Sequence, residues 1–201
     1  MTRRIQFAAW LVVGLSMPGL ARAAEGEWVS LFNGKDLSGW SIADGSSGQW
    51  KVEDGAIKSD GGPATHLFSP RGNYRNFRYR AEIKINDKGN SGMYFRTKKG
   101  PGFPKGYEAQ INSSHGDPVR TGSLYNHVKV LETLVPPDTW FTQEVEAVGN
   151  HIVIKVNGKV TVDYTDPNKT FTEGHFAYQH HDPTCKVEIR KIEVMELPDS
   201  K

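Results

Sequence analysis

Short segments in which apolar and polar residues alternate follow one another along most of the chain, separated by Gly, Asn, Asp and Pro. Alternation with a period of two is typical of strands, and no segment keeps the 3.6-residue period of an amphipathic helix. The pattern predicts an all-β protein. The predicted strands are residues 28–32, 49–52, 56–59, 77–85, 91–97, 106–112, 141–148, 151–156, 160–164, 175–179 and 187–195.

Tight turns between these strands support the prediction. Residues 157–158 are Asn-Gly, which favours the positive φ angles of a type I′ hairpin turn, and residues 53–55 are Glu-Asp-Gly. A further turn at residues 149–150 completes a three-strand meander. With this many strands and no helical layer, two antiparallel sheets packed face to face bury the apolar faces. We therefore predict a two-sheet antiparallel sandwich.

The first 23 residues have the features of an export signal. Two arginines precede an apolar run at residues 7–15, and Ala-Arg-Ala at residues 21–23 resembles a signal-peptidase site. The apolar run is shorter than the about 20 residues of a membrane span, which disfavours the alternative of an uncleaved anchor. We predict a cleaved signal peptide over residues 1–23, one domain over residues 24–201, and a periplasmic or secreted protein without membrane contact after cleavage.

Charge and cysteine content narrow the possible partners. The net charge is only +2 and the basic residues are scattered, which argues against nucleic acid or an anionic membrane as a partner. Cys185 is the only cysteine, so the chain has no internal disulfide, although an exported protein could form one. Because Cys185 follows Asp-Pro-Thr in a predicted turn, we expect a surface or half-buried thiol rather than a nucleophile.

Residues 113–139 interrupt the strand pattern. Connections of this length inside a compact domain are usually functional or disordered. The aromatic and polar residues of this segment favour function, and we expect it to fold over one end of a sheet as a rim or lid. These residues include His115, Arg120, Tyr125 and His127.

Strand alternation also predicts a polar face, because residues two apart on a strand point the same way. Tyr94 and Arg96 should share one face of their strand, and Glu108 and Gln110 should share one face of theirs. On a concave sheet these side chains would form a hydrogen-bonding surface suited to sugar hydroxyls. The alternative is that they form the solvated outer face of a sandwich.

Four segments carry a family resemblance in the order 30–40 (SLFNGKDLSGW), 90–96 (NSGMYFR), 106–111 (GYEAQI) and 121–125 (TGSLY). They resemble the motifs of the 3-keto-disaccharide hydrolase family, a 3-keto-glucoside lyase/hydratase domain formerly of unknown function. Towards the C-terminus Gln179, His181, Arg190 and Ile192 fit the family pattern, whereas His180 and Asp182 replace its Asp and Gly. The resemblance implies a jelly-roll sandwich like those of concanavalin A-like lectins and glucanases.

The resemblance also implies an exported enzyme that acts on glycosides oxidised at C3. A ketone at C3 acidifies the hydrogen on C2, so a base can form an enolate that expels the group at C1, and water then adds to the 2-hydroxyglycal. Such a site needs a base near C2, groups that hold the enolate oxygen and an acid for the leaving group. The expected partner is a 3-keto-glucoside or disaccharide.

The candidate catalytic residues are Glu108 and His181, as base or acid, and Arg96, which together with Gln110 would hold hydroxyls or the enolate charge. A cross-strand ion pair between Arg96 and Glu108 is the structural alternative. Tyr125 and His127 are expected to close the site from the long segment, although His127 and His180 could also be solvated loop residues. The candidate substrate-binding residues are Tyr94, Gln110, Tyr125, His127, Gln179 and His180.

A divalent metal ion is a further option, because imidazole and carboxylate groups cluster at His175, His180, His181 and Asp182 and a metal could polarise the ketone. The spacing matches no standard zinc signature, so we assign no metal ligand and require no cofactor.

Two other functions have to be weighed. A retaining glucanase places two carboxylates close together, but Glu108 is followed two residues later by Gln110. A non-catalytic, lectin-like carbohydrate-binding module is the main alternative to an enzyme, because this fold does not by itself imply catalysis.

Overall fold

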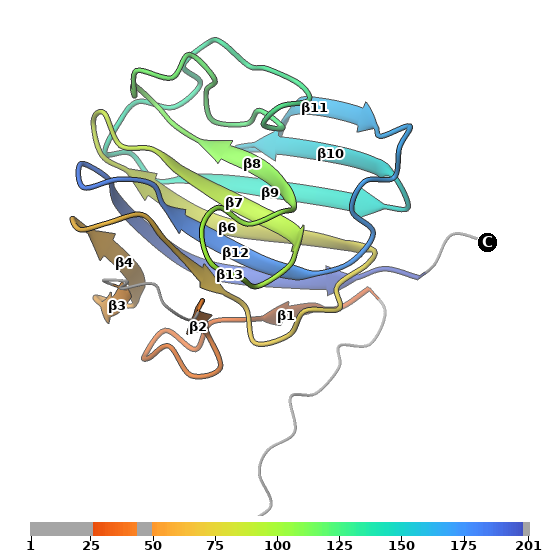
Figure 1. The fold of residues 1–201 in the computed structure, drawn as a ribbon, viewed down its shortest axis with the longest axis horizontal. Coiled ribbons are helices and arrows are strands. Elements are labelled where there is room, and N and C mark those ends of the chain that lie inside the picture. The colour runs from red at the N-terminus through yellow and green to blue at the C-terminus, as the bar shows by residue number, and fades with distance from the viewer. Residues whose placement is uncertain (1–25, 44–49, 199–201) are drawn as a thin grey trace, which may run out of the picture.

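The computed structural model describes residues 26–43 and 50–198, in which every regular element is a β-strand (Figure 1). No helix in these two ranges has the length and apolar character needed to cross a membrane. The predicted signal peptide lies outside the described residues.

The larger sheet consists, in spatial order, of β11 (Lys159–Thr165), β10 (His151–Val156), β9 (Phe141–Val148), β6 (Phe77–Ile85), β13 (Lys186–Glu196), β4 (Ala56–Asp60) and β3 (Trp50–Glu53), with β1 (Trp28–Ser30) paired to β13.

The smaller sheet lies in front of the larger one in Figure 1. All strand pairs in both sheets are antiparallel, which confirms the predicted two-sheet sandwich. The smaller sheet consists of β2 (Ser41–Ile42), β5 (Thr65–Phe68), β12 (His175–His180), β7 (Ser91–Thr97) and β8 (Tyr107–Ile111).

The core lies between the two sheets and is built from the inward side chains of alternating strands. Along β6, alternate residues from Phe77 to Ile85 are fully or almost fully buried, whereas those between them reach the surface. Tyr79 of this strand stacks on Phe176 of β12, with ring centroids 3.8 Å apart. Burial of such aromatic rings supplies a large part of the hydrophobic stabilisation.

The eleven predicted strands are all present in the described residues, and four of them match the observed bounds at both ends. Two short strands of the smaller sheet, β2 and β5, were not predicted. The four residues of β5 are all buried, so they show no polar alternation, and β2 has only two residues. A strand covered on both faces lacks the signal that revealed the others.

The long segment forms a rim, as predicted, but it lies along the outer edge of β8 rather than over one end of the sheet. Gly122 and Tyr125 donate their backbone N–H groups to the carbonyls of Gln110 and Glu108, at 3.1 and 2.9 Å. Residues 121–125 therefore cover the hydrogen-bonding edge of β8, which would otherwise be open. Figure 1 shows the rest of the segment beyond this edge.

The predicted exposure of Cys185 is wrong, because its side chain is completely buried. Its backbone N–H donates to the carbonyl of Asp182, so the turn between β12 and β13 folds back and directs the thiol into the core. Burial raises the pKa of the thiol to about 12. Cys185 is therefore a core residue without thiolate character at neutral pH.

Candidate functional site

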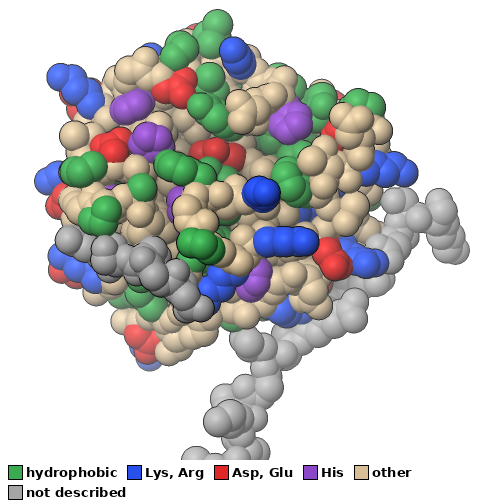
Figure 2. Space-filling view, in the orientation of Figure 1, with side chains coloured by type: hydrophobic (Ala, Val, Ile, Leu, Met, Phe, Trp, Pro, Cys, Tyr) green, Lys and Arg blue, Asp and Glu red, His purple; other side chains and the backbone are tan. Residues whose placement is uncertain are grey.

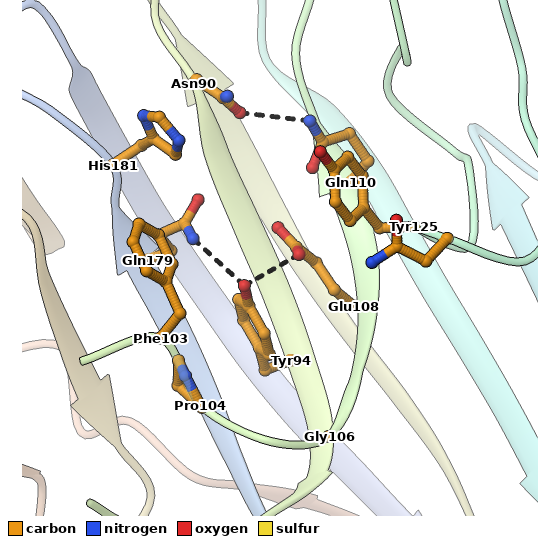
Figure 3. A pocket seen from close by; sticks show the side chains of 11 residues that line it. Asn90, Tyr94, Phe103, Pro104, Gly106, Glu108, Gln110, Tyr125, Gln179 and His181 are labelled. Atoms are coloured by element: carbon orange, nitrogen blue, oxygen red, sulfur yellow. Dashed lines mark hydrogen bonds between the residues drawn. The ribbon is translucent and has the colours of Figure 1, made fainter. Parts of the chain in front are cut away.

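A pocket of about 340 Å³ opens on the outer face of the smaller sheet, over β7, β8 and β12 (Figure 3). Figure 2 shows histidine and acidic side chains gathered on the upper left of this face. The pocket is lined mainly by polar side chains from the strands and by aromatic side chains from the loops. The lining residues are Asn90, Tyr94, Phe103, Pro104, Gly106, Glu108, Gln110, Tyr125, Asn126, Gln179 and His181.

The strand register brings the polar side chains of the pocket together. Pairing of β7 with β8 places Tyr94 directly opposite Glu108. The Tyr94 hydroxyl donates to Glu108 Oε2 at 2.8 Å, and Gln179 Nε2 donates to the Tyr94 hydroxyl oxygen at 3.1 Å (Figure 3). Tyr94, Glu108, Gln110 and Gln179 therefore share one face, as the alternation predicts.

Glu108 is the most strongly perturbed acidic group of the pocket. Only 9% of the residue is exposed, and this burial raises the pKa of its carboxyl to about 8, with a smaller contribution from the negative charge of Asp117. The hydrogen bond from Tyr94 acts in the opposite direction. A carboxyl that titrates in this range is suited to transfer protons under physiological conditions.

The two oxygens of Glu108 lie in different surroundings. Burial and the neighbouring Glu108 hold the pKa of the Tyr94 phenol far above its usual value, so the phenol keeps its proton and Oε2 keeps its donor. Oε1 lies beside Gly92, where a Cβ atom would come within 2.2 Å of it. Only glycine at this position leaves space for the carboxyl, with Oε1 available to a ligand.

The glutamine side chains of the pocket have unused acceptors. Gln110 Nε2 donates to Asn90 Oδ1 at 3.1 Å, and Gln179 Nε2 donates to Tyr94. The Oε1 atoms of Gln110 and Gln179 are buried and accept no hydrogen bond from the described residues. Because unpaired buried acceptors are costly, a ligand rich in hydroxyl groups would stabilise this arrangement.

His181 is oriented by its neighbour Asp182. Its Nδ1 lies 2.9 Å from Asp182 Oδ2. Partial burial acts to raise the pKa of Asp182, but hydrogen bonds from Thr184 and His181 outweigh it and lower the pKa to about 2. The ionised carboxylate therefore accepts a hydrogen bond from Nδ1–H, which leaves Nε2 as the ring nitrogen for a ligand. Asp182, which replaces the glycine of the family pattern, thus orients His181 in this chain.

Tyr125 of the rim also lies at the pocket, as predicted. Its hydroxyl donates to Asp117 Oδ2 at 3.1 Å, and burial together with this hydrogen bond raises the pKa of the phenol. Tyr125 therefore stays protonated at neutral pH and bounds the pocket on the β8 side.

Arg96 does not share the face of Tyr94, so its predicted place in the site is wrong. The register between β7 and β12 shifts after Tyr94, and Arg96 takes a φ of 49°, as in a β-bulge. The bulge turns the side chain away from the pocket and rules out an ion pair with Glu108. The buried guanidinium donates instead to the backbone carbonyls of Arg75, Gly149 and Phe171.

His180 and His127 are also absent from the pocket, contrary to prediction. His180 follows Gln179 on β12 and so points into the core, where it is fully buried. Burial lowers the pKa of His180, and a smaller interaction with the Gly62 backbone acts to raise it. Neither ring nitrogen makes a hydrogen bond of normal geometry. His127 is exposed and packs against the rings of Tyr107 and Tyr164.

The four residues considered as a possible metal cluster, His175, His180, His181 and Asp182, do not all come together. His175 Nδ1 contacts the Ser69 carbonyl at 2.9 Å, several residues along β12 from His181, and His180 faces the core. No group of three or more His, Cys, Asp and Glu side chains in residues 26–43 and 50–198 is placed to hold a metal ion. The donor set therefore does not fit the metal site considered from the sequence.

Several residues at or beside the pocket were missed, among them His66, Asn90 and Phe103. His66 of β5 pairs with Gln179 across the sheet, and burial, with a contribution from His181, lowers its pKa to about 4, so the ring is neutral. It was missed because β5 was missed. Asn90 and Phe103 line the pocket, and both had a signal: Asn90 opens a family motif, and Phe103 is an aromatic residue in a Gly- and Pro-rich connection.

The two antiparallel sheets and their arrangement define a jelly-roll sandwich of the concanavalin A-like type. Residues 27–195 match the 3-keto-alpha-glucoside-1,2-lyase-like domain, and the chain belongs to this 3-keto-disaccharide hydrolase family. The family resemblance of the sequence motifs is thus confirmed. A comparison with curated proteins finds no match.

Solved structures share the fold at low sequence identity. A candidate glycosyl hydrolase from Parabacteroides distasonis ATCC 8503 is 24% identical, with a TM-score of 0.73 over 86% of this chain and 94% of the other. The carbohydrate-binding module CBM66 from Bacillus subtilis is 18% identical, with a TM-score of 0.58 over 79% and 96%. A Bacillus subtilis protein of unknown function with a galectin-like fold is 13% identical, with a TM-score of 0.57 over 86% and 97%.

Proposed function

We propose that this chain is an exported enzyme that cleaves 3-keto-glycosides by elimination and hydration. The observation that carries the proposal is Glu108, a buried carboxyl that lines the pocket, whose pKa is raised to about 8 and whose Oε1 occupies the space that the missing Cβ of Gly92 leaves. Membership of the 3-keto-alpha-glucoside-1,2-lyase-like family supports the same chemistry. The signal-like sequence of residues 1–23 supports export to the periplasm or the medium.

In the proposed first step Glu108 Oε1 removes the proton from C2 of the sugar. The electron pair of the C2–H bond moves to C2–C3, and O3 becomes an enolate oxygen. Gln110 and Gln179 each have a second N–H that can donate to the ring substituents, including this oxygen, because one N–H of each is already used. Tyr94 holds the carboxyl in place through Oε2.

In the second step the enolate expels the group at C1. His181 Nε2 donates a proton to the glycosidic oxygen as the C1–O bond breaks, and Asp182 stabilises the imidazolium before this transfer. Water then adds across the resulting C1–C2 double bond: its oxygen bonds to C1 and one of its protons passes to His181 Nε2, which restores the acid. Glu108, whose proton exchanges with solvent, protonates C2 and is restored as the base. The sum of these steps is hydrolysis of the glycoside.

The proposal is tested by incubating the purified protein with a 3-keto-glucoside in D₂O. We expect release of the leaving group and deuterium at C2 of the keto sugar. A non-catalytic carbohydrate-binding module could use the same pocket, because the free acceptors of Gln110 and Gln179 serve binding equally well. Saturable binding with neither release nor exchange would favour that function and contradict the lyase.

The pH dependence should follow Glu108. Removal of the C2 proton needs the deprotonated base but not the acid, so the rate of deuterium exchange at C2 is expected to rise with pH through about 8. The hydrogen bond from Tyr94 lowers the pKa of Glu108, so Tyr94→Phe should move this limb to higher pH. Exchange rates measured from pH 6 to 10 for both proteins test this expectation. A limb at the same pH in both would argue against Glu108 as the titrating base.

The glycine beside the carboxyl gives a steric test. In Gly92→Ala the new methyl group would lie 2.2 Å from Glu108 Oε1 and 2.8 Å from Cδ, so the carboxyl has to move. Misplacing a catalytic group by about 1 Å lowers the rate on the order of 10²-fold, and we expect a loss of this size in kcat. Gly116→Ala is the control, since its Cβ would meet no atom within 4 Å. Equal rates for the two variants would contradict the assignment.

A further inference from the structure

The size of the pocket limits how much of a glycoside it can hold. At about 340 Å³ it lies near the lower end of the roughly 300–1,000 Å³ typical of small-molecule pockets. This space suits one sugar ring beside Glu108. If the proposed reaction is correct, the group attached to C1 has to extend towards the pocket mouth.

The position of the acid indicates on which side that group lies. The acid has to reach the glycosidic oxygen, so the leaving group lies next to His181 in the proposed reaction. The ring of Phe103 lies beside His181, with ring centroids 5.7 Å apart. Both residues line the pocket (Figure 3). The leaving group would therefore meet Phe103.

Phe103 is unusual in its exposure. It is 58% exposed, and only Leu131 and Val160 are other large hydrophobic residues exposed among those the structure describes. Of these three, Phe103 alone lines the pocket. An exposed aromatic ring at the edge of a polar pocket offers a flat apolar surface to a partner.

The loop that carries Phe103 is anchored at several points. Lys98 N–H and the Thr97 hydroxyl both donate to the carbonyl of Lys105, at 3.3 and 3.0 Å, which closes the base of the loop. Lys99 Nζ donates to Ser41 Oγ of β2 at 3.0 Å. In Figure 1 the loop folds back in front of β12. The ring is thus held in place, and it packs edge-on against His66 at 5.6 Å.

We propose that Phe103 forms a subsite for the leaving group of the substrate. The subsite rests on the proposed function and adds a substrate class to it: 3-keto-glucosides whose leaving group is a ring with an apolar face, either a second pyranose or an aryl group. The ring stacks on Phe103 while its glycosidic oxygen contacts His181. Binding energy from this distant part of the substrate supports the reaction at C1.

The test compares leaving groups in wild type and Phe103→Ala. We measure kcat/KM for 3-keto-glucosides that carry a glucosyl, a phenyl or a methyl group at C1. Aromatic contacts of about 0.5–1.5 kcal/mol correspond to a loss of about 2- to 10-fold, which we expect for glucosyl and phenyl but not for methyl. A loss for only one of the two rings identifies which ring the subsite takes. Phe103→Trp should keep the preference, and Leu131→Ala, which changes an exposed residue outside the pocket, should have no effect.

Two outcomes separate the two proposals. If wild type turns over all three substrates and Phe103→Ala lowers kcat/KM equally for each or for none, the subsite is wrong and the enzyme activity stands. If wild type turns over none of them, the proposed function fails and the leaving-group subsite fails with it.

Discussion

Glu108→Gln is expected to lower kcat by roughly 10²- to 10⁴-fold, the usual contribution of a general acid or base. Glutamine keeps the size of the side chain and can still accept the hydrogen bond from Tyr94, so the geometry of the pocket is retained. It cannot remove a proton from C2. The measurement is the rate of leaving-group release from a 3-keto-glucoside, together with deuterium exchange at C2. Both should be lost together.

The same substitution should stabilise the fold at high pH. The folded chain holds the Glu108 proton up to about pH 8, whereas an ordinary glutamate has a pKa of 4.5. The protonated Glu108 carboxyl therefore makes its full contribution to the free energy of unfolding below about pH 4.5. This contribution is lost as the pH rises through 8. Glutamine removes this loss, so the free energy of unfolding at pH 9 should exceed that of wild type by roughly 2–5 kcal/mol.

Urea unfolding at pH 5 and pH 9 measures this difference. The control is Glu173→Gln, which changes an exposed carboxylate paired with Arg75 and should alter stability by less than about 1 kcal/mol at either pH. A Glu108→Gln protein that is less stable than wild type at both pH values would identify Glu108 as a structural residue. Opposite changes in activity and stability are the mark of a functional site.

The sheet and half of the candidate site were predictable because strand alternation is a strong signal. On β7 and β8 one set of side chains faces the core, so the opposite set, with Tyr94, Glu108 and Gln110, has to face outwards. Whether that outer face is a solvated surface or a pocket depends on the loops. Phe103 and Tyr125 close it in, and no local pattern in the strands indicates where these loops fold.

The errors have local physical causes. Arg96 lies two residues after Tyr94, so alternation predicts the same face for both side chains. The bulge adds a residue and turns the Arg96 side chain to the opposite face. A positive φ at arginine has no sequence signature. His180 was expected in the turn after a strand that ends at Gln179, but β12 continues through His180, and neighbours on a strand point to opposite sides. His66 was missed because β5 is buried on both faces and shows no alternation.

Arg96→Met is expected to lower the free energy of unfolding by roughly 3 kcal/mol or more. The buried guanidinium binds three backbone carbonyls, and methionine would leave these acceptors without a donor at about 1–3 kcal/mol each. These contacts fasten the bulge at the end of β7 to three separate segments of the chain. The carbonyls belong to Arg75, Gly149 and Phe171. Lysine cannot replace the planar fork, so Arg96→Lys should also be destabilised.

Urea unfolding measured alongside turnover distinguishes a structural clamp from a catalytic residue. Arg78→Met is the matched control: Arg78 makes an exposed ion pair with Glu146 at 2.7 Å, and its loss should cost less than about 1 kcal/mol. The Arg96 variant should unfold at a lower urea concentration while its folded fraction keeps the wild-type pH dependence of kcat/KM, since the guanidinium faces away from Glu108. Wild-type stability combined with loss of turnover would instead place Arg96 in the chemistry and contradict the bulge geometry.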